Sequence, residues 1–283
     1  MQHPRRPPFA GLRLQRGLSM IELLVGLSIG LMTIAVALGT LVISRQVSGS
    51  VNEASQLQQQ AAQAFRSIGQ QARQAGSLRL NLAYAKDSSQ SVDLADPVAF
   101  EVPTNAATVA GVDTPTGTQD QLTLAYQNYT ENLVGSDTAQ SQFRDCLGQA
   151  GSGSPSVIRS GFSLDKPSGA SSGELDCRGS AGTAQPLIEN VADFRVRFLL
   201  QAGSFGSPTM RYRTAGTLAA ADWPHVQAIE VCLELEGNET LPATTQPYLN
   251  CANQSVVRGQ KLRMVFRNTY QIRSQGRPIE VAP

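Results

Sequence analysis

Residues 18–44 read LSMIELLVGLSIGLMTIAVALGTLVIS, and this stretch decides the fold. It contains one charged residue, Glu22, among residues that are otherwise apolar or small. About 20 apolar residues in a helix suffice to cross the hydrocarbon core of a bilayer. The stretch is longer than the apolar region of a cleaved secretory signal, and no Ala-x-Ala site follows it. It therefore predicts a transmembrane helix.

The residues in front of this stretch are basic. Arg5, Arg6, Arg13 and Arg16 lie within residues 1–17, which contain no acid. Because basic residues stay on the cytoplasmic side of a membrane helix, we expect the first residues in the cytoplasm. The rest of the chain is then exported, which predicts a single-pass protein of the bacterial inner membrane with its C-terminal domain in the periplasm.

Glu22, Gly26 and Gly30 are the unusual residues of the apolar stretch. A carboxylate inside a membrane span costs about 3 kcal/mol, so Glu22 is a functional hypothesis. The alternative is a solvated carboxylate at the level of the lipid headgroups. The two glycines form a small-xxx-small pair, which lets membrane helices approach closely. The alternative explanation of the two glycines is that a membrane helix simply tolerates them, at a cost of about 1 kcal/mol each relative to alanine.

The helical pattern continues beyond the membrane stretch. Apolar residues recur at alternating steps of four and three, and Gly76 follows as a helix stop. The positions are Val47, Val51, Ala54, Ala61, Phe65, Ile68 and Ala72, with Gln58 in the one gap. The pattern predicts one helix over residues 18–76, with a transmembrane part, 18–44, and an amphipathic part, 45–76. A coiled-coil dimer is the alternative reading of the stripe.

Residues 77–283 have the character of a β-rich domain. The candidate strands are Val98–Val102, Leu122–Tyr126, Val157–Leu164, Val191–Leu200, Val226–Leu235 and Lys261–Ile272. Three of them alternate between apolar and polar residues, which predicts sheets with one buried face. We expect an α+β fold in which the long N-terminal helix packs on an antiparallel sheet in one globular domain.

The last of these strands carries Arg263, Arg267 and Arg273 opposite its apolar face. By the same alternation, Cys232 points away from the apolar face of its own strand. If Cys232 is bonded to Cys251, the segment carrying Cys251 must cross the outer face of the sheet.

The four cysteines, Cys146, Cys177, Cys232 and Cys251, form no Cys-x-x-Cys pair, and the chain has two histidines. No metal site is expected from this set. An even number of cysteines in an exported domain favours disulfides and allows three connectivities. We prefer the pairing of sequence neighbours, Cys146–Cys177 and Cys232–Cys251, and buried free thiols are the alternative.

The junction Arg16-Gly17-Leu18, followed by Glu22, resembles the type III signal of type IV prepilins and pseudopilins. The resemblance implies that a prepilin peptidase cuts between Gly17 and Leu18 and so removes residues 1–17 as a leader. It also implies that Leu18 becomes the N-methylated terminus and that Glu22, at the fifth mature position, serves assembly and register. The family's usual first residue is Phe, and the departure at Leu18 favours a minor subunit.

The domain carries a second resemblance, to the PilW group of minor pilins. It rests on Asp145-Cys146-Leu147-Gly148, Leu175-Asp176-Cys177, the segment from Pro186 to Val191, and Arg267-Asn268. The resemblance implies a minor type IV pilin that acts in pilus assembly and twitching motility, near the fibre tip. The implied partners are the prepilin peptidase, other minor pilins, the major pilin, the inner-membrane assembly platform and a tip adhesin. Residues 77–140 match no pattern.

The sequence contains no catalytic motif and no cofactor motif, so we expect neither enzyme activity nor a cofactor. The formal net charge of +1 gives no nucleic-acid footprint, and nucleic acid is not an expected partner. Three alternatives remain. They are a minor pseudopilin of type II secretion, a pilus-tip module that binds DNA or surfaces through Arg263, Arg267 and Arg273, and a membrane-tethered periplasmic enzyme.

Overall fold

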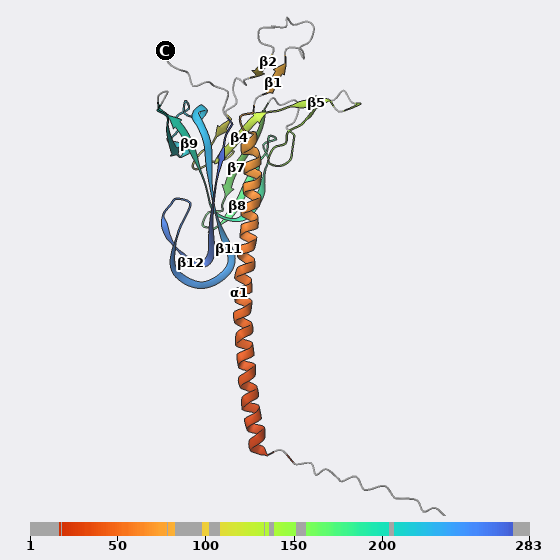
Figure 1. Ribbon diagram of the computed structural model, residues 1–283, viewed down its shortest axis with the longest axis vertical. Helices are drawn as coiled ribbons and strands as arrows, with labels where there is room; N and C mark the ends of the chain where they lie inside the picture. Colours follow the sequence, from red (N-terminus) through yellow and green to blue (C-terminus); the bar gives the residue numbers. More distant parts are fainter. Residues whose placement is uncertain are drawn as a thin grey trace, which may run out of the picture. The chain divides into compact units, whose positions relative to one another are not determined.

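The computed structural model describes residues 17, 19–77, 79–82, 98–101, 108–132, 134–135, 139–150, 157–203 and 207–273 (Figure 1). The chain divides into two compact units, Met1–Ser50 and Val51–Pro283. Helix α1, Met20–Gln74, contributes residues to both. The predicted helix start at Leu18 and the predicted strand end at Val102 lie outside the described residues.

Helix α1 ends where the sequence predicts a stop. Gly76 has a φ of +76°, in the left-handed region that favours glycine. The backbone N–H of Ala75 donates to the carbonyl of Gln71, and that of Ser77 donates to Gln74. The N–H of Gly76 donates instead to the carbonyl of Ala125, so the helix terminus is tied directly to the sheet.

One antiparallel sheet dominates the second unit. Its strand order is β12-β11-β9-β8-β7-β4-β3, and β10 also pairs with β9. The strands are β3 (Val109–Ala110), β4 (Leu122–Gln127), β7 (Val157–Asp165), β8 (Gly173–Arg178), β9 (Ala184–Ala202), β10 (Thr209–Arg213), β11 (Val226–Leu249) and β12 (Ser255–Gln271). Two small hairpins, β1 (Arg79–Leu82) with β2 (Val98–Glu101) and β5 (Thr130–Asn132) with β6 (Ala139–Ser141), stand outside it, as do the short helices η2 (Ala215–Thr217) and η3 (Trp223–His225).

The predicted fold class, a long helix packed on an antiparallel sheet, is confirmed. The six predicted strands correspond to β2, β4, β7, β9, β11 and β12, of which β9 and β11 are much longer than predicted. Strands β1, β3, β5, β6, β8 and β10 were not predicted. They have at most six residues, and none shows sustained apolar alternation.

The core lies between the second part of α1 and the inner face of the sheet. Strand β9 contributes Phe194 and Phe198, and β11 contributes alternate residues from Ile229 to Leu235, all within 1% of complete burial. Leu262, Met264, Phe266 and Tyr270 of β12 pack against this cluster while remaining partly exposed. Period-two alternation therefore identified the buried faces of these three strands correctly.

The predicted helix stripe is correct at Ala61, Ile68 and Ala72, which are buried, and wrong at Phe65 and toward its N-terminal end. Val51 is 61% exposed, Gln58 is exposed and Phe65 is only half-buried. The buried apolar residues of this segment are Leu57, Ala61, Ala64, Ile68, Ala72 and Ala75, and its buried polar residues are Glu53 and Gln71. The predicted steps average 3.5 residues, whereas a straight helix has 3.6 per turn, so a strict heptad stripe drifts by about 20° per heptad. The side chain of Val47 lies outside the described residues.

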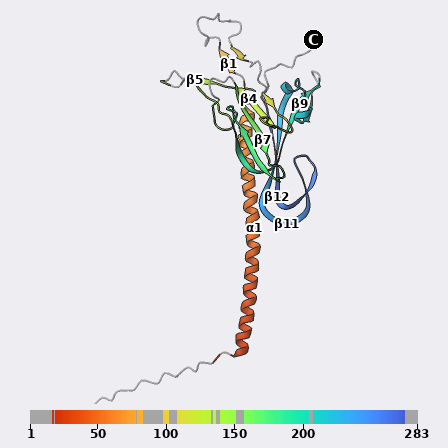
Figure 2. The ribbon, with the colours of Figure 1, turned by 180° about the vertical axis from the view of Figure 1, so that it is seen from behind.

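The hairpin of β11 and β12 curls back on itself (Figures 1 and 2). The register shifts between Glu236 and Thr240, and shifts twice more before Pro247. Such irregularities bend a strand and increase its twist. The hairpin tip thereby returns to the outer face of β11, where Cys251 meets Cys232.

Candidate functional site

The first part of α1 exposes an unbroken apolar surface. Fifteen large apolar residues between Met20 and Ile43 are each at least 48% exposed. An 18-residue window of the helix has a mean hydropathy of 2.3, and none of it is buried. By length and composition the helix is able to cross a membrane. An apolar surface of this extent requires lipid or other proteins to cover it.

The hydroxyl groups of this segment are satisfied within the helix. Ser28 donates to the carbonyl of Val25 at 2.8 Å, Thr33 to that of Gly30 at 2.8 Å, and Thr40 to that of Ala37 at 2.9 Å. Inside a bilayer every polar group needs such a partner. These residues therefore suit an apolar environment, and Glu22 is the one ionisable side chain between residues 20 and 44.

Glu22 lies in the first turn of α1 and is exposed. An acid in this position interacts favourably with the partial positive charge of the helix N-terminus. Gly17 is exposed and precedes the helix, whereas Leu18 lies outside the described residues. Gly17 and Glu22 thus both lie at the N-terminal end of the helix. The terminus that processing would create, Leu18, is not among the described residues.

Gly26 and Gly30 face open space. A Cβ atom built on either glycine would meet nothing within 4 Å. No packing against the described part of the chain therefore requires a glycine at these positions. The same holds for Gly39. Nine residues separate Gly39 from Gly30, so the two lie on opposite faces of the helix, whereas Gly26 and Gly30 share one face.

The second part of α1 is fixed to the sheet by polar contacts as well as apolar ones. Glu53 is 7% exposed, and its Oε1 accepts the backbone N–H of Glu239 at 2.7 Å. Farther along, the Tyr270 hydroxyl donates to the carbonyl of Phe65 at 2.7 Å. The ring of Tyr270 lies directly over Gly69, where a Cβ would come within 2.6 Å of it. Gly69 therefore permits this close approach.

A buried polar side chain, that of Gln71, forms hydrogen bonds with the sheet near the C-terminal end of α1. Gln71 is 2% exposed, and its Oε1 accepts a hydrogen bond from the Ser160 hydroxyl at 3.0 Å. The Tyr126 hydroxyl lies 3.0 Å from the same oxygen and donates to the carbonyl of Arg144 at 2.7 Å. Burial, together with the charge of Asp145, raises the pKa of Tyr126. The phenol therefore stays neutral and serves as a donor.

Asp145 organises the loop that carries the first cysteine. Its Oδ1 accepts the backbone N–H groups of Leu147 and Gln149, and its Oδ2 accepts that of Ser180. A Cβ at Gly179 would lie 2.5 Å from the carboxylate, so the approach requires glycine. The conformation of the Asp-Cys-x-Gly segment is thus set by backbone donors gathered around one acid.

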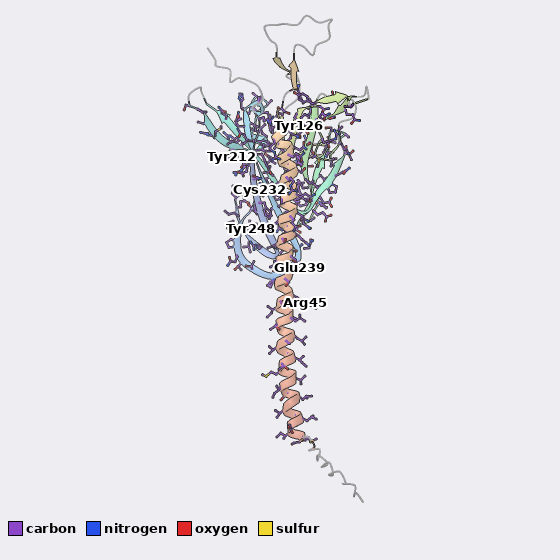
Figure 3. The ribbon with its side chains drawn as sticks, turned by 45° about the vertical axis from the view of Figure 1, so that its right-hand side comes forward. Arg45, Tyr126, Tyr212, Cys232, Glu239 and Tyr248 are labelled. Atoms are coloured by element: carbon purple, nitrogen blue, oxygen red, sulfur yellow. A yellow bond between two sulfur atoms is a disulfide. The ribbon has the colours of Figure 1, made fainter. Side chains whose placement is uncertain are left out.

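The two disulfides join the neighbouring cysteines. Cys146 is bonded to Cys177 of β8, with 6.2 Å between the Cα atoms, and Cys232 is bonded to Cys251, with 5.6 Å. The pairing preferred from the sequence is the one present in the structure. As the alternation of β11 predicted, Cys232 (labelled in Figure 3) lies outside the apolar cluster, and the hairpin tip that carries Cys251 is bonded to it.

Ion pairs cover the outer face of the sheet beside this disulfide. Glu234 and Glu236 are nearly completely buried, and the guanidinium of Arg263 pairs with both. Glu236 also receives hydrogen bonds from Lys261 at 2.9 Å and from Ser171 at 2.6 Å. Burial alone would raise the pKa of the Glu236 carboxyl, but these hydrogen bonds and the charge of Arg263 outweigh it and lower the pKa.

Of the three arginines that suggested a nucleic-acid-binding face, two already have partners within the chain. Arg263 is engaged with the two acids, and Arg267 lies 3.6 Å from Glu230 and donates to the carbonyl of Asn250 at 2.7 Å. Arg273 is exposed. Two of the three positive charges are therefore neutralised or occupied within the chain, which weakens the alternative of a nucleic-acid surface on β12.

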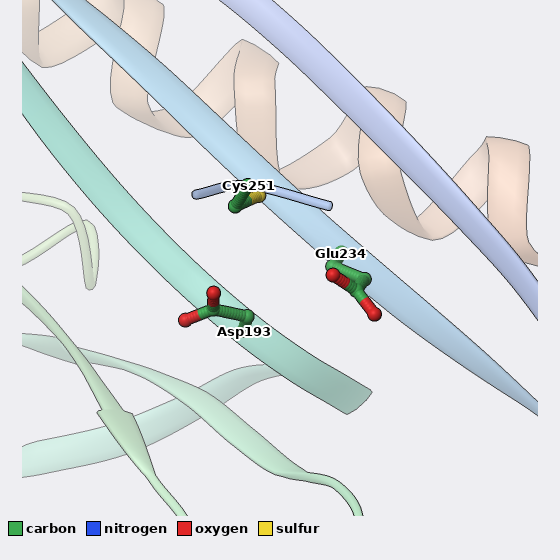
Figure 4. A group of neighbouring side chains, drawn as sticks. All are labelled: Asp193, Glu234 and Cys251. Carbon is green, nitrogen blue, oxygen red and sulfur yellow. The ribbon is translucent and has the colours of Figure 1, made fainter. Parts of the chain in front are cut away.

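Asp193, Glu234 and Cys251 gather three potential metal ligands within 4.8 Å of one another (Figure 4). The Cys251 sulfur is bonded in a disulfide, so it offers no thiolate. Glu234 pairs with Arg263, and Asp193 pairs with Arg195 at 2.7 Å. The cluster is consistent with a buried ion-pair network and does not form a metal centre.

Sequence reasoning missed Glu53 and Asp145 as structural determinants. Both are acids whose partners are backbone N–H groups, and for Glu53 the partner lies 186 residues away. Glu53 carried a usable signal, since it is spaced four residues from Leu57 and eight from Ala61 on one helix face.

Two comparisons with known proteins gave a match, and a third gave none. Residues 148–274 match the family PilW, described as Type IV Pilus-assembly protein W. A type IV-like pilin from Thermus thermophilus is a structural match with 12% identity and a TM-score of 0.38, covering 78% of this chain and 100% of that chain. No curated protein sequence matches the chain. The family match includes strands β7 to β12, three of the four cysteines and Arg267-Asn268. Together with the apolar helix and the antiparallel sheet, this match supports the resemblance seen in the sequence: over residues 148–274 the chain is similar to the PilW family of type IV pilus-assembly proteins.

Proposed function

We propose that this chain is a minor type IV pilin, which joins the fibre through its N-terminal helix, close to the tip, after prepilin peptidase has cut between Gly17 and Leu18. The observation that carries the proposal is the exposed apolar surface from Met20 to Ile43. Such a surface is covered first by the inner membrane and then, in the fibre, by the helices of other subunits. The role is structural rather than enzymatic.

Glu22 supplies the specificity of this step. Processing creates a positively charged amine at Leu18, which is then N-methylated. The amine of a neighbouring subunit pairs with the Glu22 carboxylate when the two helices are in register. In an apolar bundle this attraction is strong, and an unpaired buried charge is strongly disfavoured. The pairing therefore rejects wrong registers rather than simply adding stability.

The other proposed partners come from the family resemblance. The arginines of residues 1–17 favour a cytoplasmic leader, where the prepilin peptidase acts, and a periplasmic domain. The processed subunit is then passed to the inner-membrane assembly platform, where it meets other minor pilins and the major pilin. A tip adhesin is a further partner of a subunit placed near the tip.

Mass spectrometry of the N-terminus in purified fibres tests the proposal. We expect a chain that begins at N-methylated Leu18, and an intact Met1 in assembled fibres would overturn the assignment. Glu22→Ala should insert into the membrane normally and fail to enter fibres. Glu189→Ala is the matched control, because Glu189 is exposed on β9 and lies far from the helix in sequence. Normal incorporation of Glu22→Ala would refute the register role.

A further inference from the structure

Strand β10 is exposed on both faces. All five residues from Thr209 to Arg213 are exposed, although the strand is paired with β9 over its whole length. Within the described part of the chain, β10 pairs with no other strand, so its second edge offers unpaired backbone groups. An exposed strand edge is a template on which another extended segment can add.

The charges around β10 are unbalanced. On the adjoining strand β9, Arg195 pairs with Asp193 at 2.7 Å and Arg197 pairs with Glu230 at 2.5 Å. In contrast, the guanidinium groups of Arg211 and Arg213 make no ion pair with any described residue. They stand opposite Leu200 and Phe198 in the register, so both project on one face of the strand.

The other face of β10 is apolar and aromatic. Met210 is 53% exposed and Tyr212 is 40% exposed. The guanidinium of Arg197 lies 5.0 Å from the centre of the Tyr212 ring, and this cation–π contact holds the ring in place. A half-exposed aromatic ring that is already fixed loses little conformational freedom on binding.

We propose that β10 is a docking edge for an extended, acidic segment of another protein, which adds as a further strand beside it. Carboxylates of the added strand would pair with Arg211 and Arg213, and its apolar residues would cover Met210 and Tyr212. A strand that alternates acidic and apolar side chains matches both faces at once, because side chains alternate across a strand.

Nucleic acid fits this surface less well. Affinity for duplex DNA comes largely from neutralising several phosphates, on the order of 6–10 in a strong complex, whereas β10 offers two uncompensated arginines. A protective role is the competing explanation, since charges on an edge strand also prevent self-association. The proposed docking does not depend on the assembly role of the helix, because β10 belongs to the second unit and the helix surface to the first.

The test uses the full chain in detergent micelles and a fluorescent peptide in which Glu and Val alternate over eight residues. We expect saturable binding by fluorescence anisotropy, together with protection of residues 209–213 from amide hydrogen exchange. A peptide with Lys in place of Glu should not bind. A Glu/Val peptide with alternate backbone amides N-methylated should also fail, because it cannot form the ladder.

Charge-reversal variants distinguish peptide docking from a purely protective role of the β10 arginines and from DNA binding. Arg211→Glu/Arg213→Glu should weaken binding of the acidic peptide on the order of tenfold or more, and Arg159→Glu, at an exposed arginine of β7, should not. Unchanged thermal unfolding would show that the double variant is folded. The proposal is overturned if no acidic peptide binds, if the N-methylated peptide binds equally, or if the double variant only self-associates. Binding of a DNA duplex in place of the peptide, with the same dependence on Arg211 and Arg213, would also overturn it.

Discussion

The Glu53 carboxylate on helix α1 accepts the backbone N–H of Glu239 on β11, with 2.7 Å between Oε1 and N. The carboxylate lies flat over Gly237, where a Cβ atom would come within 2.4 Å of the carboxyl carbon. Gly237 stands where the register of β11 first shifts against β12. Among the helix residues whose burial the structure describes, Glu53 is the first that is buried, so this contact lies where the described packing of α1 on the sheet begins.

Gly237→Ala should lower the free energy of unfolding by about 1–2 kcal/mol, because the new methyl group displaces the carboxylate from its donor. The same substitution in a Glu53→Ala background should cost clearly less, because nothing is left to displace. Denaturant unfolding of the four proteins of this cycle in detergent measures the coupling. Equal costs of Gly237→Ala in both backgrounds would show that the two residues are independent.

Alternation was sufficient to predict the central strands and insufficient for the rest. Phe194 and Phe198 of β9, and Ile229 to Leu235 of β11, face one core, so burial imposes period two on the sequence. Beyond Leu235 the strand continues for 14 residues in the curled hairpin, where most side chains are exposed. From Asn238 onward no side chain of this strand is buried, so no alternation is required and the sequence does not indicate a strand there. Strand β10 escapes detection for the same reason.

The Cys232–Cys251 disulfide should hold the hairpin tip on the outer face. Cys232→Ala/Cys251→Ala should lower the free energy of unfolding by about 3 kcal/mol, since the bond closes a loop of 19 residues. Hydrogen exchange should speed up at the tip, around Tyr248 and Asn250, before the core exchanges. Denaturant unfolding and exchange mass spectrometry measure both effects.

Tyr248→Phe is the matched control for this bond. It removes only the 2.6 Å hydrogen bond from the Tyr248 hydroxyl to Glu234 and should cost about 1 kcal/mol. If the double alanine variant keeps the tip as protected as in the native chain, the tip is held by its hydrogen bonds rather than by the disulfide.

Glu236 should make stability depend on pH. Its pKa in the folded chain is lowered below the ordinary value of 4.5, so ionisation of this carboxyl stabilises the fold. The stabilisation is fully present above pH 4.5 and is lost as the pH falls through the lowered folded-state pKa. Glu236→Gln, which cannot ionise, should therefore be less stable than the native chain at neutral pH, on the order of 1 kcal/mol.

The difference between the native chain and Glu236→Gln should shrink as the pH falls below 4.5, as followed by denaturant unfolding. Burial raises the pKa of Asp120, which acts in the opposite direction, but this group is present in both proteins and cancels in the difference. Glu189→Gln, at an exposed site, controls for charge alone. A difference that stays constant with pH would contradict the role of Glu236.

The candidate site was predictable where a residue departs from its neighbours. Glu22 is an acid in an apolar run, and Gly26 and Gly30 are small residues in a helix, so each is visible without a structure. Asp145 could not be found in this way, and for Glu53 the sequence shows only that it shares a helix face with Leu57 and Ala61. Their partners are backbone N–H groups of β11 and of the loop around Gly179. Every residue except proline has such a group, so the sequence does not show which one a carboxylate will bind.

Gly26→Leu and Gly30→Leu should block fibre incorporation without disturbing the fold. Nothing in the described chain lies within 4 Å of a Cβ at either position, so the unfolding of the domain should be unchanged. A leucine on this face would nevertheless keep a neighbouring helix from approaching closely. Gly39→Leu is the matched control, since its side chain projects from the opposite face. Incorporation is measured by quantifying the chain in sheared fibres against its amount in membranes. If all three variants enter fibres equally, the glycine pair serves no helix contact and Gly26 and Gly30 are merely tolerated in the membrane.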